Sequence, residues 1–181
     1  VGLSASDGQI ASPRRVYNGG ADAALVFDEQ GQARILPAGE PIDAVHDAVS
    51  GVGASDTVPG RNGLLVTAGE NTAMTTRVAP EVRHPRTAAG LSEDGQTLIL
   101  AVIDGRQPGW SIGIDLVALA DLMIEHGAHT ALNLDGGGSS AFVLRHPDTG
   151  DIVAQNRPSD GHFRAGANSI GVRLIDESKA R

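Results

Sequence analysis

Three consecutive glycines, Gly136–Gly138, lie between two apolar segments that we interpret as strands, Ala131–Leu134 and Ala141–Leu144. Glycine loses much backbone entropy when it is ordered, so a run of three needs a conformational or steric reason. Positive φ angles are one such reason, and a ligand that approaches the main chain too closely for any Cβ atom is another. A plain turn between strands is the simpler interpretation, but it needs only one or two glycines. The pattern therefore favours a functional loop.

Polar residues flank this loop on both sides. Asn133 and Asp135 precede the glycines, and Ser139 and Ser140 follow them. Backbone N–H groups in such a loop can face an anion, and the carboxylate, amide and hydroxyl groups can bind a polar ligand. The loop is not a nucleotide P-loop, because the required spacing and its lysine are missing. We predict a site that handles carbohydrate or phosphate.

Glycine and proline are spread along the whole chain of 181 residues, which indicates many short elements joined by tight turns. Predicted strands outnumber helices and do not alternate with them regularly, so we expect an α+β fold with a strand-rich mixed sheet. One clear amphipathic helix is predicted at about 115–126, with Asp115 as its N-cap and Gly127 as its stop. We expect one domain over residues 1–175 and a tail over 176–181.

The remaining elements are predicted from short apolar runs and turn residues. Leu98–Ile103 is continuously apolar, which is typical of a central strand buried on both faces. The other predictions are a hairpin of Ala24–Phe27 and Ala33–Leu36, a short helix at Pro41–Val49, a strand at Gly63–Thr67, a hairpin of Ala88–Leu91 and Gln96–Ile103, and a final strand at Ser169–Ile175.

Composition excludes several classes of function. The net charge of −8 argues against a nucleic-acid-binding surface. The chain has no cysteine, which excludes disulfides and thiolate chemistry, and its six histidines show no metal-ligand spacing. No apolar run reaches the roughly 18 residues of a membrane span, and no signal peptide is visible. Lys179 is the single lysine, so anion contacts fall to arginine.

Three further segments combine polar groups with predicted strand ends or turns. Asp104-Gly105-Arg106 follows the apolar strand, where catalytic groups are common, although Asp-Gly is also a favoured turn pair. His84–Thr87 places Arg86 at the start of a strand, either at a site or on a surface edge. Asn156–Gly161, with Arg164 and Asn168, is either a substrate-gripping loop or a solvated turn. Trp110 could stack on a sugar or belong to the core.

The order of these motifs resembles the phosphodiester glycosidase family. The residues that carry the resemblance are His84-Pro85-Arg86-Thr87-Ala88, then Asp104-Gly105-Arg106-Gln107, then the predicted helix, then Asn133-Leu134-Asp135-Gly136-Gly137-Gly138-Ser139-Ser140. The resemblance covers about residues 1–175 and is densest from 84 to 145. It implies hydrolysis of the glycosidic bond of a sugar-1-phosphodiester, or of a related glycan, with a carbohydrate or sugar-phosphate as substrate.

The same resemblance suggests roles for individual residues. Glycoside hydrolysis commonly uses two carboxylates, and Asp104 and Asp135 form the best pair, with their separate roles unassigned. Arg86, and less firmly Arg106, would hold the phosphodiester by charge-assisted hydrogen bonds. The expected substrate-binding residues are Thr87, Arg106, Asn133, Gly136, Gly137, Gly138, Ser139, Ser140, Asn156, Arg157 and Asn168.

Two other functions remain open on the sequence. One is a non-catalytic carbohydrate-binding or exopolysaccharide-assembly module, and the other is a polysaccharide hydrolase that does not need phosphate. No cofactor is required; a divalent cation at Asp135 is a minority interpretation, because its oxygen ligands suit hard cations. Family members, many of them bacterial, usually carry an Asn-Gly-Gly-Phe-Phe-like segment before the stretch matching Val1-Gly2-Leu3. We therefore expect an upstream piece that completes the domain, and a secreted or cell-envelope location.

Overall fold

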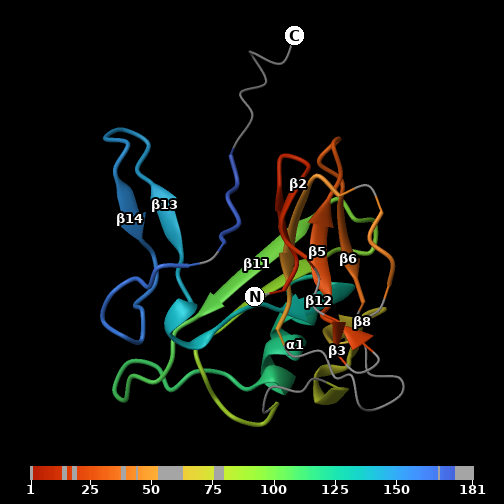
Figure 1. Cartoon of the computed structure of the whole chain (residues 1–181). Coiled ribbons are helices and arrows are strands. Elements are labelled where there is room, and N and C mark those ends of the chain that lie inside the picture. The colour runs from red at the N-terminus through yellow and green to blue at the C-terminus, as the bar shows by residue number, and fades with distance from the viewer. Residues whose placement is uncertain are drawn as a thin grey trace.

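The computed structural model describes residues 2–13, 16–17, 20–37, 40–43, 45–52, 63–75, 80–166 and 168–173. Its body consists of two five-stranded sheets and the helix α1 (Leu116–Glu125), and a separate hairpin stands apart from them (Figure 1). Every strand pairing within the described residues is antiparallel. The α+β class is confirmed, but the sheets are antiparallel where a mixed sheet was expected.

The two sheets are built from separate halves of the chain. The first has the order β2 (Gln9–Ser12), β1 (Ser4–Ser6), β7 (Asp47–Ser50), β5 (Ala24–Phe27) and β6 (Ala33–Leu36). The second has the order β11 (Leu98–Ile103), β10 (Arg86–Leu91), β12 (Thr130–Asn133), β8 (Leu64–Thr67) and β9 (Glu70–Asn71). Short elements complete the description: β3 (Val16–Tyr17) with β4 (Gly20–Ala21), β13 (Val143–Arg145) with β14 (Ile152–Ala154), and the 3-10 turns η1 (Ala73–Thr75) and η2 (Gly137–Ser139).

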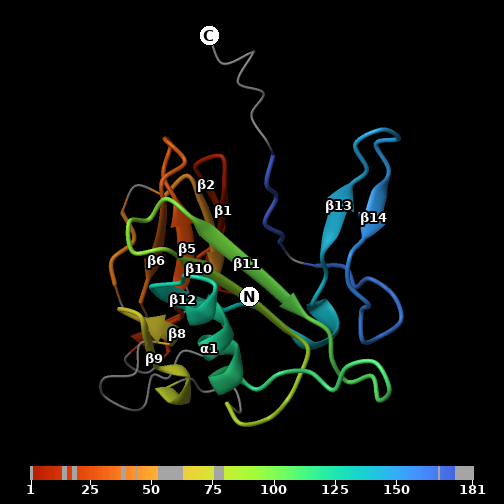
Figure 2. The ribbon, with the colours of Figure 1, turned by 180° about the vertical axis from the view of Figure 1, so that it is seen from behind.

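The second sheet is the middle layer, between α1 and the first sheet (Figure 2). Successive strand residues point to opposite faces, so Ala88 of β10 packs toward the helix and Ala89 toward the other sheet. Ala131 and Leu132 of β12 divide in the same way. This explains why the strands of the middle layer consist of unbroken apolar runs.

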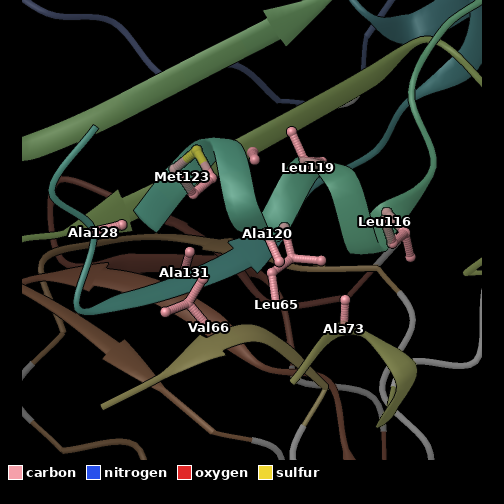
Figure 3. Close-up of a cluster of buried hydrophobic side chains, with 10 residues drawn as sticks. Leu65, Val66, Ala73, Leu116, Leu119, Ala120, Met123, Ala128 and Ala131 are labelled. Atoms are coloured by element: carbon pink, nitrogen blue, oxygen red, sulfur yellow. The ribbon is translucent and has the colours of Figure 1, made fainter. Parts of the chain in front are cut away.

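Helix α1 covers the outer face of the middle sheet with the side chains that helical spacing predicts. Leu116, Leu119, Ala120 and Met123 are buried, and Figure 3 shows them gathered between the helix and the sheet. The N-cap is confirmed, because Asp115 Oδ1 accepts a hydrogen bond from the N–H of Ala118 at 2.8 Å. Gly127 has a φ of +92°, as expected for a left-handed helix stop.

Several predicted elements are confirmed and others are wrong. Both hairpins, the strand at Leu64–Thr67 and the strand before the glycines are present. The predicted helix at Pro41–Val49 is wrong. The described residues 41–43 are not helical, and Asp47–Ser50 forms the strand β7, because its successive residues lie on opposite faces of the first sheet. The final strand is also wrong over the described residues 169–173, and residues 174 and 175 lie outside the described part. The strand after the glycines begins later, at Val143.

Strand β11 is not the central strand that its apolar sequence predicted. It lies at one edge of the middle sheet, and Leu100 is 42% exposed. The predicted burial on both faces is also wrong, because an edge strand has a neighbour on one side only and none of the residues of β11 is fully buried. None of the helices in the described part of the chain combines the length and the apolar character that crossing a membrane requires.

Candidate active site

The topology of the middle sheet brings three motifs to the same end of its strands. Strand β10 runs antiparallel to both β11 and β12, so its start lies beside the ends of these two neighbours. Arg86 pairs with Ile103, the residue before Asp104, and the N–H of Leu134, the residue before Asp135, donates to Thr87 O at 2.8 Å. Figure 1 shows the end of β11 pointing toward η2 and the base of the β13–β14 hairpin.

Each of the three glycines has its own structural reason. Gly137 has a φ of +62°, which confirms the predicted positive φ, and its N–H donates to Pro85 O at 2.9 Å. A Cβ atom on Gly136 would lie 2.8 Å from the same Pro85 oxygen. A Cβ atom on Gly138 would collide with the ion pair of Asp160 and Arg164. The close contacts come from the protein's own atoms, so the glycines alone do not require a ligand.

The carboxylate of Asp104 anchors two loops. Oδ2 accepts from Trp110 Nε1 at 2.9 Å, and Oδ1 accepts from Asn156 Nδ2 at 3.0 Å. The backbone N–H of Arg157 lies 3.0 Å from both oxygens. Three donors therefore bind this carboxylate, and the N–H of Arg157 is shared between its two oxygens. Asp104 therefore holds the 107–111 turn and the 155–157 segment together.

Asn156 connects this anchor to the glycine loop. Its Nδ2 also donates to Ser140 O at 3.1 Å, and its Oδ1 accepts from the N–H of Phe142 at 2.7 Å. Thr87 adds a link from below, because its Oγ1 lies 3.3 Å from the buried Ser140 Oγ. The predicted residues Thr87, Ser140 and Asn156 are therefore brought together with Asp104.

Arg106 lies over the glycine loop with a strained backbone. Its φ is +57°, which is rare for a residue with a side chain and often marks a functional position. Its Nε donates to His84 Nδ1 at 3.3 Å, and its Nη1 lies 3.0 Å from the place of a Cβ atom on Gly137. Burial, and then the charges of Arg106 and Arg86, lower the pKa of His84. The side chain of Arg106 is exposed and available to an anion.

Arg86 occupies a different environment, below the loop. It is only 3% exposed, and its Nη2 donates to Val82 O at 2.9 Å, with Nε 3.5 Å from Ile114 O. Burial and then the nearby Arg106 lower its pKa, whereas Asp115 acts in the opposite direction. This guanidinium therefore places a buried positive charge close enough to His84 and Arg106 to interact with both.

Asp135 is exposed at the start of the glycine loop. Its Oδ1 accepts a hydrogen bond from the adjacent N–H of Gly136 at 2.9 Å.

Asn133 is buried, with 2% of its surface exposed, and its Nδ2 donates to Val52 O at 3.2 Å. Its Oδ1 has no hydrogen-bond partner in the described part of the chain. Asn133 thus joins the glycine loop's strand to the end of β7. Ser139 is half-buried beside Gly138, and Asn168 is exposed.

Three residues at this end of the sheet are not among the expected catalytic or substrate-binding residues. His84 accepts from Arg106, Gln107 Nε2 donates to Arg157 O at 2.8 Å, and Trp110 donates to Asp104. The side chain of Trp110 is 63% exposed, so it is not the core residue that one interpretation proposed. No local sequence pattern indicated that Trp110 would donate to Asp104.

The sequence model of the phosphodiester glycosidase family matches residues 1–173, which is nearly the whole chain. This chain belongs to the phosphodiester glycosidase family. Asp104, Arg106 and Asp135–Ser140 all lie within the matched region.

The relatives include proteins from bacteria and vertebrates. The SPbeta prophage-derived uncharacterized protein YomE of Bacillus subtilis (strain 168) is 33% identical over 159 residues, which is 87% of this chain and 23% of that protein. The N-acetylglucosamine-1-phosphodiester alpha-N-acetylglucosaminidase of Bos taurus is 42% identical over 59 residues, which is 33% of this chain and 11% of that protein. This chain therefore spans about a quarter or less of each of these relatives.

A solved structure shares the fold of this phosphodiester glycosidase domain. The zebrafish N-acetylglucosamine-1-phosphodiester alpha-N-acetylglucosaminidase catalytic domain, auto-inhibited by its pro-peptide, aligns with a TM-score of 0.61 at 23% identity. The alignment covers 88% of this chain and 51% of that one. At this identity the likeness establishes the fold alone.

The family domain also contains a cluster of possible metal ligands on the first sheet. Ligand atoms of Asp7, His46 and Asp47 lie within 4.8 Å of one another. They come from the β1–β2 turn and from the start of β7, not from the edge with the glycine loop. The divalent cation considered at Asp135 stays an untested prediction.

Proposed function

We propose that this domain hydrolyses the glycosidic bond of a sugar-1-phosphodiester, releasing the sugar and leaving a phosphomonoester. The observation that supports this proposal is the assembly of an exposed carboxylate, an exposed arginine and the glycine loop at one end of the strands of the middle sheet. Asp135, Arg106 and Gly137 provide these three parts. Membership in the phosphodiester glycosidase family favours this chemistry over other uses of the same groups.

In this proposal Asp135 is the reacting carboxylate and Asp104 is a positioning residue. Three donors bind the carboxylate of Asp104, and protonation of either oxygen would weaken these hydrogen bonds. Asp135 is exposed at the loop and accepts one described bond, from its neighbour Gly136. The two carboxylates therefore differ in availability, and this difference supports the separate roles that we propose for them.

The arginines also divide between contact and support. Arg106 is exposed beside Gly137, so its guanidinium can bind the phosphodiester by charge-assisted hydrogen bonds. Arg86 is buried and donates to backbone carbonyl groups, so we propose that it adds positive potential near Arg106 without contacting the substrate. Arg106, which was the less firm assignment from sequence, becomes the principal phosphate contact.

The reaction balances with one water molecule. Water attacks C1 of the sugar, the C1–O bond to the phosphate breaks, and its electron pair leaves on the phosphate oxygen. Asp135 accepts the proton of the attacking water and returns it to solvent. A phosphate leaving group needs little protonation, so one available carboxylate is sufficient.

The test is a panel of sugar-1-phosphodiesters assayed for release of the reducing sugar. Asp135→Asn should lower kcat by about 10²–10⁴-fold, the usual contribution of acid–base catalysis, with the domain still folded. Asp94→Asn, on the distant Ser92–Gln96 turn, is the matched control and should retain wild-type kcat. Release of sugar by Asp135→Asn at the wild-type rate would refute the assignment.

The sequence analysis expected Arg86 to hold the phosphodiester, but Arg86 is buried. Its burial favours a second candidate, a hydrolase that does not need phosphate. This alternative predicts that neutral oligosaccharides are cleaved and that Arg106→Ala leaves kcat/KM nearly unchanged. Our proposal predicts that Arg106→Ala raises KM for phosphodiesters, because one charge-assisted contact is lost. Binding of glycans without release of any product would instead identify a non-catalytic carbohydrate-binding module.

A further inference from the structure

The only tryptophan of the chain lies at the candidate site with its ring in solvent. Trp110 is 63% exposed, and its Nε1 donates to Asp104 Oδ2 at 2.9 Å. The hydrogen bond fixes the polar edge of the indole and leaves the apolar face open. Indole combines a large apolar surface with one donor, and this combination suits a rigid recognition surface.

The local backbone holds this ring in place. Pro108 and Gly109 occupy the middle of a turn closed by the Trp110 N–H and Gln107 O at 3.0 Å, and Gly109 has a φ of +87°. These features fit a type II turn, which favours proline and then glycine at its centre. Gln107 and Ser111 exchange two backbone hydrogen bonds at 2.9 Å, and Ser111 Oγ donates to Asp104 O. The turn is therefore tied to the end of β11.

A cation accompanies the ring. The guanidinium carbon of Arg157 lies 5.8 Å from the centre of the Trp110 ring, within the range of a cation–π contact. The backbone of Arg157 is bonded to Asp104, and Asn156 links the same carboxylate to Ser140 O. Trp110 is thus connected through Asp104 and Asn156 to the end of the glycine loop.

We propose that Trp110 is a carbohydrate-stacking residue whose exposed face receives a pyranose ring of the substrate beside the glycine loop. This inference rests on the proposed function, which it deepens by adding a sugar-binding subsite. Asp104 positions the ring through Nε1, and Arg157 adds a donor for sugar hydroxyl groups. The C–H bonds of a pyranose are apolar on one face and match the open face of indole, so stacking removes apolar surface from water.

Binding can be followed without turnover, because fluorescence excited selectively at tryptophan, and not at Tyr17, reports on Trp110 alone. The wild-type chain is titrated with neutral monosaccharides and sugar-1-phosphates, with inorganic phosphate as the control. We expect a saturable change in emission with at least one sugar and none with inorganic phosphate. A change with phosphate alone, or no change with any sugar, overturns the proposal.

Two substitutions separate stacking from a merely structural role. Trp110→Ala removes the ring and should raise KM by about threefold to tenfold with little change in kcat, the range expected for one aromatic contact. Trp110→Phe keeps an apolar ring but loses the bond to Asp104, so it should recover most of the KM. Ile152→Ala, at the end of β14 next to the hairpin turn, is the matched exposed control and should behave as wild type.

The outcomes also distinguish this inference from the proposed function. Saturable emission changes without sugar release support the stacking site and contradict the hydrolase. Sugar release with an unchanged KM in a folded Trp110→Ala contradicts the stacking site and leaves the hydrolase standing. Equal losses of kcat in Trp110→Ala and Trp110→Phe also contradict it, because they show that the ring acts only by holding Asp104.

Discussion

The backbone N–H of Arg157 lies 3.0 Å from each carboxylate oxygen of Asp104, although the two residues are 53 positions apart in the sequence. This contact joins the end of β11 to the segment that follows β14. It makes Asp104 part of the architecture of the candidate site, in addition to any contact with substrate. The predictions below begin with this residue.

Asp104→Asn should loosen the 155–166 segment and lower stability. An amide in place of the carboxylate presents an NH₂ group to the donors Arg157 N and Trp110 Nε1, so at least one donor loses its acceptor. We expect a loss of about 1–3 kcal/mol in the free energy of unfolding, measured by urea titration. Trypsin should also cleave after Arg164 faster than in wild type; Arg157 is followed by Pro158, which protects that bond from trypsin.

The control for this substitution is Asp94→Asn. Asp94 also caps a turn, but its bonds from Ser92 Oγ and Gln96 N span only two residues. Its loss should leave cleavage at Arg164 unchanged. Equal proteolytic rates in wild type and Asp104→Asn would contradict the anchoring role.

Gly137→Ala should impair activity more than its backbone strain explains. Alanine at a φ of +62° is strained by about 1–2 kcal/mol, and its Cβ atom would press on the guanidinium of Arg106 at 3.0 Å. Displacement of that guanidinium should lower kcat/KM by about tenfold to a hundredfold. Activity on a sugar-1-phosphodiester and the urea midpoint are measured together.

Gly95→Ala separates the two effects of the Gly137 substitution. Gly95, in the turn between β10 and β11, has a similar φ of +69°, but a Cβ atom added there would meet no atom within 4 Å. It should show the same shift in urea midpoint with normal activity. Parallel losses of activity in both variants would mean that strain alone is responsible.

Asn133→Asp should be among the most destabilising changes near the loop. The position is 2% exposed, and the new carboxylate would face Val52 O in place of an N–H donor. An uncompensated buried charge typically lowers stability by about 3–5 kcal/mol. Urea unfolding at neutral pH should show this loss, and acidic pH should reduce it as the carboxyl group is protonated. Asn168→Asp, at an exposed position, should change the midpoint little.

His84 and His46 should titrate on opposite sides of the ordinary histidine pKa of 6.5. Burial, then Arg106 and Arg86, lower the pKa of His84, whereas a hydrogen bond with Asp47 raises that of His46. Stability linked to His84 should fall as pH drops below 6.5, because the unfolded chain then binds a proton that the folded chain does not. Stability linked to His46 is complete below 6.5 and is lost as pH rises through its raised pKa.

Proton NMR of the imidazole signals measures both titrations, and the spectra of His84→Asn and His46→Asn assign them. A midpoint for His84 above that of His46 would contradict the described environments. Activity should also decline when His84 is protonated, since its Nδ1 could then no longer accept the bond from Arg106 Nε.

The sequence by itself determined the local features of this protein. Helix α1, its cap at Asp115 and its stop at Gly127 follow from apolar spacing and from the chemistry of single residues. The hairpins follow from short apolar runs separated by turn residues. The positive φ of Gly137 was also predictable, because only glycine adopts that conformation easily. The order of the motifs was sufficient to indicate the family.

The tertiary structure decided which of these motifs meet and which side chains remain accessible. Asp104 and Asp135 both follow predicted strands, so they looked equivalent in the sequence. In the folded chain the 155–157 segment hydrogen-bonds the carboxylate of Asp104, whereas Asp135 stays exposed. Arg86 and Arg106 are distinguished in the same way, by burial. The edge position of β11 and the place of Trp110 at Asp104 depend on contacts between distant segments. Burial and hydrogen-bond occupancy are properties of the packed chain, because each depends on residues far away in sequence.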